Sequence, residues 1–350
     1  MDQRFDPDAL RTFAEDVLGR AGVPAEPARA VAAGLVEGDL YGHVTHGLAL
    51  LAGYVGEVEK GMMATDGQPE VVADAGAAVT WDARRLPGVW TTMLAVDEAV
   101  ARAGRHGVGA VAIRRSHHIA CLAAFLEAPA RAGHVVLIFS SDPSGAHVAP
   151  HGGIAPLYSP DPVAAGLPAD PDPILIDVSM SITTAGMVGK LKAAGERFPH
   201  KWMLGPDGEP TDDPGALAAG GSILPLGGLE YGHKGFGLGL LVEALTQGLP
   251  GYGRAEAPGD WGAGVLVLAF APAQFAGDDA FRRQTTWLAA ASRAARPRDP
   301  ARPVRLPGQL ALDRKRAAVA DGVPLSPAIV EALDGLAARY GVALPPARRP

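Results

Sequence analysis

The sequence contains a single cysteine, Cys121, among its 350 residues. One cysteine excludes an internal disulfide and a metal site built from several cysteines. The sequence also lacks a run of about 18 apolar residues, the length that a membrane-spanning helix needs. Its first residues, MDQRFDPDAL, lack the basic segment and following apolar segment that mark a secretory signal. We therefore expect a soluble, cytoplasmic protein.

Basic residues are also fewer than acidic residues. The chain has 31 Lys and Arg against 38 Asp and Glu, a net charge of −7. Surfaces that bind nucleic acid or anionic membranes are usually basic, so we expect neither partner. The hydrophobic share of 48% and the charged share of 20% are ordinary for a globular protein. The 31 prolines and 45 glycines are dispersed between periodic segments and indicate turns.

Hydrophobic periodicity predicts helices that alternate with strands. We expect helices over residues 6–19, 24–40, 89–107, 278–296 and 326–340, and an alanine-rich helix ending near Gly133. We expect strands over residues 77–82, 108–113, 134–139, 174–178 and 264–270, and a linker rich in proline and arginine over 296–307. Such alternation, with helices at both ends, is typical of an α/β protein.

Residues 222–251 contain the densest glycine cluster, around Lys234. The spacing predicts a glycine-rich loop that leads into a buried helix from Leu238, an arrangement suited to a phosphate. It does not match a Rossmann fingerprint, because Gly235-x-Gly237-x-Gly239 has the wrong spacing. The alternative is that these glycines only allow helices to pack closely.

Histidines stand at two predicted turns. His43 and His46 flank Thr45, and His117 and His118 follow a predicted buried strand. An imidazole beside a pocket can exchange a proton near neutral pH, although surface or capping histidines are the alternative. The spacing is not that of a zinc protease and no further cysteine is present, so we expect no metal site. A hydrolase triad is not indicated either, because no GxSxG motif occurs.

Asp177 ends another predicted strand and is followed by hydroxyl side chains. These groups suit a ribose, a phosphate or the orientation of a histidine. The alternative is an ordinary helix cap with polar turn residues.

Taken in order along the chain, the motifs resemble those of the malate/L-lactate dehydrogenase family of the second, non-Rossmann type. That family includes sulfolactate and ureidoglycolate dehydrogenases, 2,3-diketogulonate reductase and piperideine-2-carboxylate reductase. The segment 39–54, DLYGHVTHGLALLAGY, resembles the family's D-x-R-G-x-x-S-H-G-x-x-R-L-P-x-Y. SHH at 116–118, VAPHGG at 148–153, DVSMSITTAGMV at 177–188, HKGFGL at 233–238 and LPG at 306–308 resemble later family motifs.

The resemblance implies a mixed-sheet α/β cofactor domain with helical N- and C-terminal segments packed together. It suggests a helical segment over 1–75, a central domain over 76–300 and a C-terminal segment over 301–350. Family members transfer hydride between NADH or NADPH and a 2-oxo acid, a 2-hydroxy acid or a cyclic imine. They form homodimers that share the active site.

By motif match, the resemblance implies His46 and His118 as proton-transfer groups and Asp177 as a group that orients the charged form. Thr45, Leu50 and His117 match substrate positions. The implied cofactor contacts are Ser140, Asp142, Ser181, Thr183, Thr184, Gly186, His233, Lys234, Gly235 and Gly308.

The chain departs from the family where it matters for specificity. Leu50 stands where the family has an arginine that holds the substrate carboxylate, and an apolar side chain cannot replace a guanidinium. We expect Arg114, Arg115 or an arginine of a partner chain to take over, or else an altered substrate. A cyclic-imine reductase is one alternative function, and a member that binds the cofactor without catalysis is another.

Overall fold

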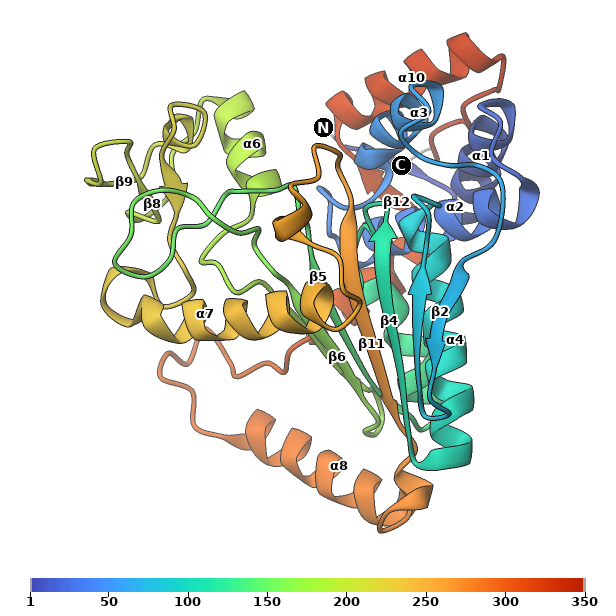
Figure 1. Ribbon diagram of the computed structural model, residues 1–350, viewed down its shortest axis with the longest axis vertical. Coiled ribbons are helices and arrows are strands. Elements are labelled where there is room, and N and C mark those ends of the chain that lie inside the picture. Colours follow the sequence, from blue (N-terminus) through green and yellow to red (C-terminus); the bar gives the residue numbers. More distant parts are fainter. Residues whose placement is uncertain (1, 349–350) are drawn as a thin grey trace.

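The computed structural model describes residues 2–348 and centres on a seven-stranded mixed sheet (Figure 1). Its strand order is β2-β3-β4-β11-β5-β6-β7. β3 and β4 run parallel, whereas the other neighbouring strands run antiparallel. The strands are β2 (Glu70–Asp74), β3 (Ala78–Asp82), β4 (Val108–Ser116), β5 (Val135–Ser141), β6 (Val163–Leu167), β7 (Ile174–Val178) and β11 (Ala263–Phe270). This mixed order confirms the predicted non-Rossmann α/β fold.

Five of these strands were predicted to within three residues at each end, and two were not predicted. β2 is an edge strand whose residues are all exposed, so it shows no apolar–polar alternation. The sequence of β6, VAAGL, is too short and too rich in small residues to give a strand signal.

Each face of the sheet is covered by a different helix. α4 (Gly88–His106) packs on β4 and β11, in a core shared with Val111 and Ile113. On the other side, α7 (Gly228–Glu243) and a π turn (Ala244–Gly248) lie against β5 and β11. Ala112 belongs to that second core, as the alternation of side chains along a strand requires.

The two ends of the chain pack together, as the resemblance implied. β1 (Gln3–Phe5) pairs with β12 (Val323–Leu325). Around this ribbon pack α1 (Pro7–Arg20), α2 (Ala25–Tyr41), α3 (Leu51–Glu59), α9 (Gln309–Asp321) and α10 (Pro327–Tyr340). α1 begins at its predicted cap, because the Asp6 carboxylate accepts hydrogen bonds from the Asp8 and Ala9 amides. The division at residues 75 and 300 stays a prediction.

A smaller lobe projects beside the sheet, at the left of Figure 1. It holds α6 (Ala185–Ala194) and a three-stranded sheet of β8 (Met203–Leu204), β9 (Pro210–Thr211) and β10 (Ser222–Ile223). Its own core includes Tyr158, Phe198 and Met203. α8 (Asp278–Ala294) lies at the bottom of the view, at its predicted position.

Other helix predictions need correction. The expected alanine-rich helix before Gly133 is only a 3-10 turn (Leu122–Phe125) and the short α5 (Glu127–Arg131). α6 and α9 were not predicted, because few of their residues are buried: Val188 in α6, and Leu312 and Ala318 in α9. Without a wide apolar stripe, periodicity gives no signal.

The glycine-rich loop expected around Lys234 does not form. These glycines lie within α7, which begins at Gly228, and Lys234 is an exposed residue in its middle. A side chain at Gly235 would place its Cβ 2.4 Å from the Leu226 amide nitrogen, and one at Gly239 would place it 2.8 Å from the Tyr158 ring. The glycines therefore allow close packing, which was the alternative interpretation.

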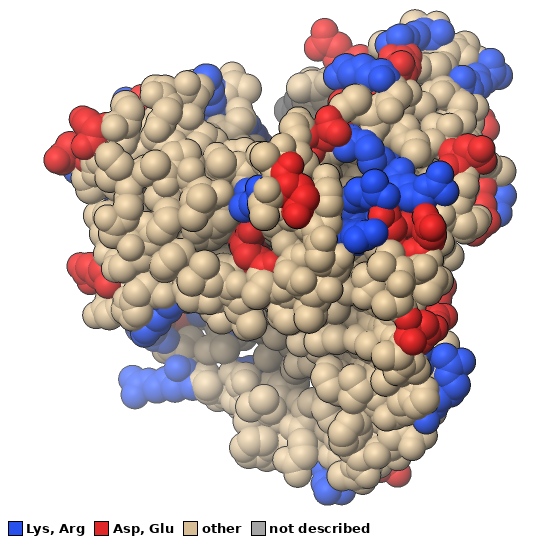
Figure 2. All heavy atoms as spheres, viewed as in Figure 1, with Lys and Arg blue, Asp and Glu red and all other residues tan. Residues whose placement is uncertain are grey.

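The outer side of α7 is not buried, contrary to the expectation. Its exposed leucines are Leu229, Leu238, Leu240 and Leu241. Within residues 2–348, no helix is both long enough and apolar enough to cross a membrane. Figure 2 shows acidic and basic side chains mixed over the visible face, with basic groups gathered where β4 ends in Figure 1.

We predict opposite effects for two glycines of α7. Gly235→Ala should lower the free energy of unfolding by about 1–3 kcal/mol, because its Cβ would collide with the Leu226 backbone. Gly237→Ala is the matched control: its Cβ would meet nothing within 4 Å, so alanine should stabilise the helix by about 0.5–1 kcal/mol. Urea and thermal unfolding followed by circular dichroism measure both. Equal stability of the two variants would refute the packing role.

Candidate active site

The structure brings His46 and His118 together. Their ring centroids are 5.8 Å apart and the planes are tilted by 32°. His46 lies in the turn between α2 and a 3-10 helix (Leu48–Leu50), and His118 follows the end of β4. Two segments far apart in the sequence thus supply two facing imidazoles.

A hydrogen bond to Asp39 holds the turn that carries His46. The Asp39 carboxylate accepts a hydrogen bond from the Leu48 amide at 2.7 Å. A side chain at Gly47 would place its Cβ 2.2 Å from this carboxylate, so the close approach requires glycine. Burial raises the pKa of Asp39 to about 7, although the Leu48 amide opposes the rise. The His46 turn is therefore fixed by a buried carboxyl group.

His46 contacts groups on both sides. Its Nδ1 lies 2.8 Å from Thr45 Oγ1. The start of α6 lies nearby, since a Cβ at Gly186 would be 3.7 Å from His46 Cε1. Burial, reinforced by the charge of His43, lowers the pKa of His46 to about 4. His46 is therefore uncharged at neutral pH in the free protein.

His118 is held in one orientation by its Nδ1. The Tyr54 hydroxyl lies 2.8 Å from this nitrogen, and the Ala120 amide donates to it at 3.3 Å. An amide can only donate, so Nδ1 accepts and Nε2 carries the proton. The Trp261 ring packs on His118, with centroids 4.6 Å apart. Burial lowers the pKa of His118 well below its ordinary value.

His117 packs against Tyr54 and Trp261, the two aromatic residues that also contact His118. Its side chain is fully buried, with its ring centroid 5.1 Å from that of Trp261 and its Nε2 3.7 Å from Glu57 Oε2. Burial lowers its pKa to about 4. In this chain its ring contributes packing beside His118.

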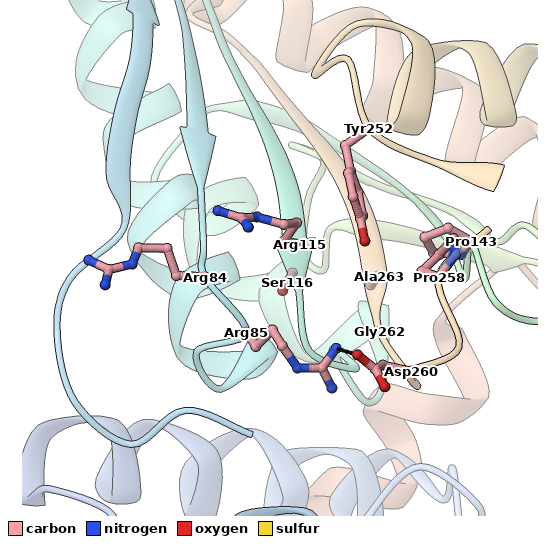
Figure 3. A pocket seen from close by; sticks show the side chains of 10 residues that line it. All are labelled: Arg84, Arg85, Arg115, Ser116, Pro143, Tyr252, Pro258, Asp260, Gly262 and Ala263. Atoms are coloured by element: carbon pink, nitrogen blue, oxygen red, sulfur yellow. Dashed lines mark hydrogen bonds and ion pairs between the residues drawn. The ribbon is translucent and has the colours of Figure 1, made fainter. Parts of the chain in front are cut away.

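Two clefts are lined by residues close in sequence to the two histidines. The first has a volume of about 380 Å³ and is lined by arginines, among them Arg115, one of the arginines expected to bind the substrate carboxylate (Figure 3). The second, of about 670 Å³, is lined by two predicted residues, Asp177 and Gly308. Arg305 and Arg314 also line it, and within residues 2–348 neither forms an ion pair with a carboxylate. Gly308 precedes the N-terminus of α9, where helix amides favour an anion.

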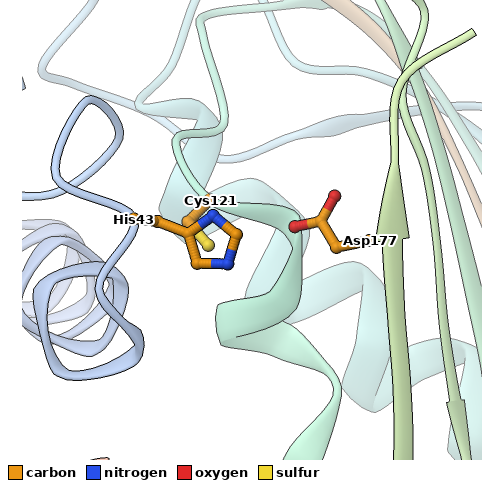
Figure 4. Close-up of side chains that lie close together, drawn as sticks. All are labelled: His43, Cys121 and Asp177. Carbon is orange, nitrogen blue, oxygen red and sulfur yellow. The ribbon is translucent and has the colours of Figure 1, made fainter. Parts of the chain in front are cut away.

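At the edge of the second cleft, Asp177 faces His43 and Cys121 (Figure 4). Potential ligand atoms of the three side chains all lie within 4.8 Å of one another. Asp177 Oδ2 accepts a hydrogen bond from the Ala123 amide at 3.1 Å. Burial raises the pKa of Asp177 and, with the nearby Asp177 charge, that of the Cys121 thiol. Sequence analysis missed Cys121 as a neighbour of Asp177, because no spacing connects the two.

The residues after β7 are arranged around the start of α6. Ser181 Oγ donates to the Thr183 carbonyl at 2.6 Å, and Thr184 Oγ1 caps α6 by accepting from the Met187 amide. This geometry fits the alternative of an ordinary helix cap, and it also places Gly186 beside His46.

The remaining predicted residues make other contacts. Ser140 lies at the end of β5, and Asp142 accepts hydrogen bonds from Ser144. His233 packs on His151, and the Lys234 ammonium lies 5.2 Å from the centre of the Tyr231 ring. Leu50 packs partly buried against the main core.

Sequence reasoning also missed Tyr54 and Trp261, which hold His118 in place. Tyr54 occupies the last position of the quoted motif over 39–54, so a signal was present. Trp261 stands alone in a loop and carries no pattern.

The fold is a mixed α/β architecture with two facing histidines, and comparison with known proteins gives the family. The malate/L-lactate dehydrogenase family model matches residues 5–334. The chain belongs to this family.

Two curated relatives differ in named activity. A (2R)-3-sulfolactate dehydrogenase (NADP(+)) of Chromohalobacter salexigens is 38% identical over 75% of this chain and 80% of its own length. A Δ1-pyrroline-2-carboxylate reductase of Ancylobacter novellus is 32% identical over 76% of this chain and 79% of its own length. In fold, the malate dehydrogenase of Entamoeba histolytica superposes with a TM-score of 0.93 over 99% of this chain and 100% of its own, at 22% identity.

We predict that Asp39 makes the protein less stable as the pH rises. Its carboxyl has a pKa of about 7 when folded and 3.8 as a model group. Between these values the unfolded chain loses the proton first, so rising pH favours unfolding. Asp39→Asn keeps an acceptor for the Leu48 amide but cannot ionise. Relative to wild type it should gain roughly 2–4 kcal/mol between pH 4 and 7, measured by urea unfolding.

The exposed Asp16→Asn is the control for this comparison. The buried histidines have the opposite pH dependence, but they are common to all three proteins and cancel in the difference. A stability difference between Asp39→Asn and wild type that stays constant from pH 4 to 8 would contradict the prediction.

Proposed function

We propose that the protein is an NAD(P)H-dependent oxidoreductase that transfers hydride to or from a 2-oxo acid, a 2-hydroxy acid or a closely related compound. The observation that carries this proposal is the facing pair of His46 and His118 in a chain of this dehydrogenase family. Hydride transfer to a carbonyl leaves an oxygen that needs a proton, and a half-buried imidazole within reach can supply it.

The two histidines have different roles in this proposal. The Ala120 amide fixes the tautomer of His118 that carries a proton on Nε2, so His118 donates a hydrogen bond to the substrate oxygen. Thr45 can donate or accept, so it supports either tautomer of His46. His46 is therefore the group that gains and loses the proton, and His118 orients the substrate.

The cleft beside Asp177 fits a nicotinamide dinucleotide. Arg305, Arg314 and the N-terminus of α9 offer positive charge to phosphate groups, and the hydroxyls that precede α6 suit a ribose. When bound, the cofactor supplies or accepts the hydride. Asp177, Gly186 and Gly308 would line its site, with Ser140, Asp142, Ser181, Thr183 and Thr184 as further contacts.

Substrate choice depends on what replaces the family arginine at Leu50. Arg114 and Arg115 do not offer a free guanidinium, because both pair with the buried Asp82. Leu50 therefore favours a substrate with an apolar part beside its carboxyl group. A cyclic imine carboxylate is the second candidate, supported by the similarity to the Ancylobacter reductase.

We predict that the two reaction directions depend differently on pH. His46 is neutral above its pKa of about 4, so oxidation should be insensitive to pH above about 5. Reduction needs the protonated imidazole, so its kcat/KM should fall by about tenfold per pH unit between about pH 5 and 8. His46→Asn should lose about 10²–10⁴-fold in rate and flatten the pH profile of the reduction.

The assay uses 2-oxo acids, 2-hydroxy acids and cyclic imine carboxylates, each with the NADH or NADPH couple. Binding of both cofactors by tryptophan fluorescence separates a true loss of catalysis from a loss of cofactor. Binding without turnover of any substrate would favour the non-catalytic alternative. His46→Asn retaining full turnover would remove the assigned role.

We also propose that the protein is a homodimer. α7 exposes Leu238, Leu240 and Leu241, and α8 exposes Trp287, which is 67% accessible. Large contiguous apolar patches usually mark interfaces. His233 and Lys234 are exposed on the same helix. In a dimer these two predicted cofactor contacts would reach the site of the partner subunit.

We predict that Leu241→Glu disrupts this dimer, because a carboxylate would be buried at the interface. Light scattering after size exclusion should show half the wild-type mass. Val319→Glu, on the exposed side of α9, should keep the wild-type mass. Lys234→Ala should weaken cofactor binding in the dimer. Two results together would overturn the proposal: a monomeric wild type, and a Lys234→Ala variant that binds the cofactor as tightly as wild type.

A further inference from the structure

A second charged site lies at the carboxyl ends of the parallel strands β3 and β4. Arg84 and Arg85 follow β3, and Arg114 and Arg115 lie at the end of β4. Ligands of α/β sheets commonly bind at the carboxyl ends of parallel strands. This edge is therefore a favourable place for a binding site.

The cleft of about 380 Å³ opens among these arginines. Figure 3 shows Arg85 directed at Asp260, whereas the side chains of Arg84 and Arg115 extend away from Tyr252 and Asp260. The Tyr252 hydroxyl points into the cleft. Guanidinium and phenol groups are donors, so the cleft is equipped to bind an acceptor.

The positive charge of this cleft is only partly neutralised. Asp82 pairs with Arg114 and Arg115, and Asp260 Oδ2 lies 2.9 Å from Arg85 Nη1. Within residues 2–348, Arg84 pairs with no carboxylate. The buried Nη2 of Arg85 has no hydrogen-bond partner. A buried donor without a partner is costly, and here Nη2 is the one guanidinium nitrogen of Arg85 without an acceptor, since Nε donates to the Met62 carbonyl.

The backbone at these arginines is strained. Arg84, Arg85 and Arg115 have positive φ angles of 51°, 67° and 51°. Side chains other than glycine rarely adopt this conformation, and such strain clusters at ligand sites. The Arg85 amide donates to the Arg115 carbonyl at 2.7 Å, which holds the two strained segments together.

We propose that this cleft binds a small molecule with two or more carboxylates, and that the ligand displaces Asp260 from Arg85. Asp260 occupies one side of the guanidinium fork and thus stands in for the ligand's carboxylate. A second carboxylate would accept a hydrogen bond from the Tyr252 hydroxyl, which points into the cleft (Figure 3). The partly exposed Asp260, at 40% side-chain exposure, can move out without disrupting a core.

Displacement of Asp260 would affect the candidate active site through its neighbour in the sequence, Trp261. Trp261 follows Asp260, and its ring packs on His118 with centroids 4.6 Å apart. Ser116, which lines the cleft, leads directly to His117 and His118. The cleft is therefore an effector site, and Trp261 reports its occupancy. The binding claim does not depend on the reaction proposed above.

The test uses citrate as a tricarboxylate probe and inorganic phosphate as a single-anion probe, at ionic strength matched with NaCl. Calorimetry measures binding, and tryptophan fluorescence reports Trp261. Citrate should bind wild type saturably and change the fluorescence, with phosphate at least about tenfold weaker. Arg85→Gln should weaken citrate binding by about tenfold or more.

Asp260→Asn gives the opposite expectation, because it removes the internal competitor: citrate should bind more tightly than in wild type. This variant keeps the test decisive if Arg85→Gln fails to fold. Arg29→Gln, at an exposed arginine of α2, controls for net charge. Trp261→Phe should keep the calorimetric binding and lose the fluorescence change.

Three results would overturn the proposal. One is the absence of saturable citrate binding to wild type. Another is an equal effect of Arg85→Gln and Arg29→Gln, which would reduce the cleft to general charge attraction. The third is citrate affinity that Asp260→Asn leaves unchanged or weakens.

Discussion

The hydrogen bond between the buried Asp39 carboxyl and the Leu48 amide supports the rest of the candidate site. It lies beneath the turn that carries Thr45 and His46, and Gly47 is required because any Cβ would overlap the carboxylate. The helical ends of the chain enclose this pair, since α2 packs against α1, α4 and α9. The packing of the chain ends therefore positions the His46 turn.

Enclosure also explains the charge state of the site. His46 and His118 lose solvation without gaining a carboxylate partner, so burial lowers the pKa of both. The arginines, in contrast, line the two clefts, and Arg84, Arg305 and Arg314 are exposed. The two histidines of the site are thus uncharged in the free protein, and the arginines attract anions at the edges of the clefts.

Motif order predicted much of this arrangement, because the residues that build the His46 turn are contiguous in the sequence. The same reasoning failed at α7, where composition cannot tell a phosphate loop from a helix that packs through its glycines. Gly235 makes the difference visible only when the Leu226 backbone is in place. Trp261 and Cys121 escaped prediction for a related reason. Each acts through partners more than 50 residues away, and single residues have no period.

Under the proposed function, Leu50 in place of the arginine that the family resemblance implies would have an electrostatic consequence as well as a steric one. A guanidinium beside the substrate carboxylate would neutralise its charge within the site. With Leu50, an anionic substrate would bring an uncompensated negative charge into a poorly solvated space beside His46. A nearby negative charge raises the pKa of an imidazole, and low polarity strengthens the effect. Substrate binding would then favour the protonated His46 that reduction needs. Leu50 would thus weaken binding of the substrate carboxylate and, at the same time, couple proton uptake by His46 to substrate binding.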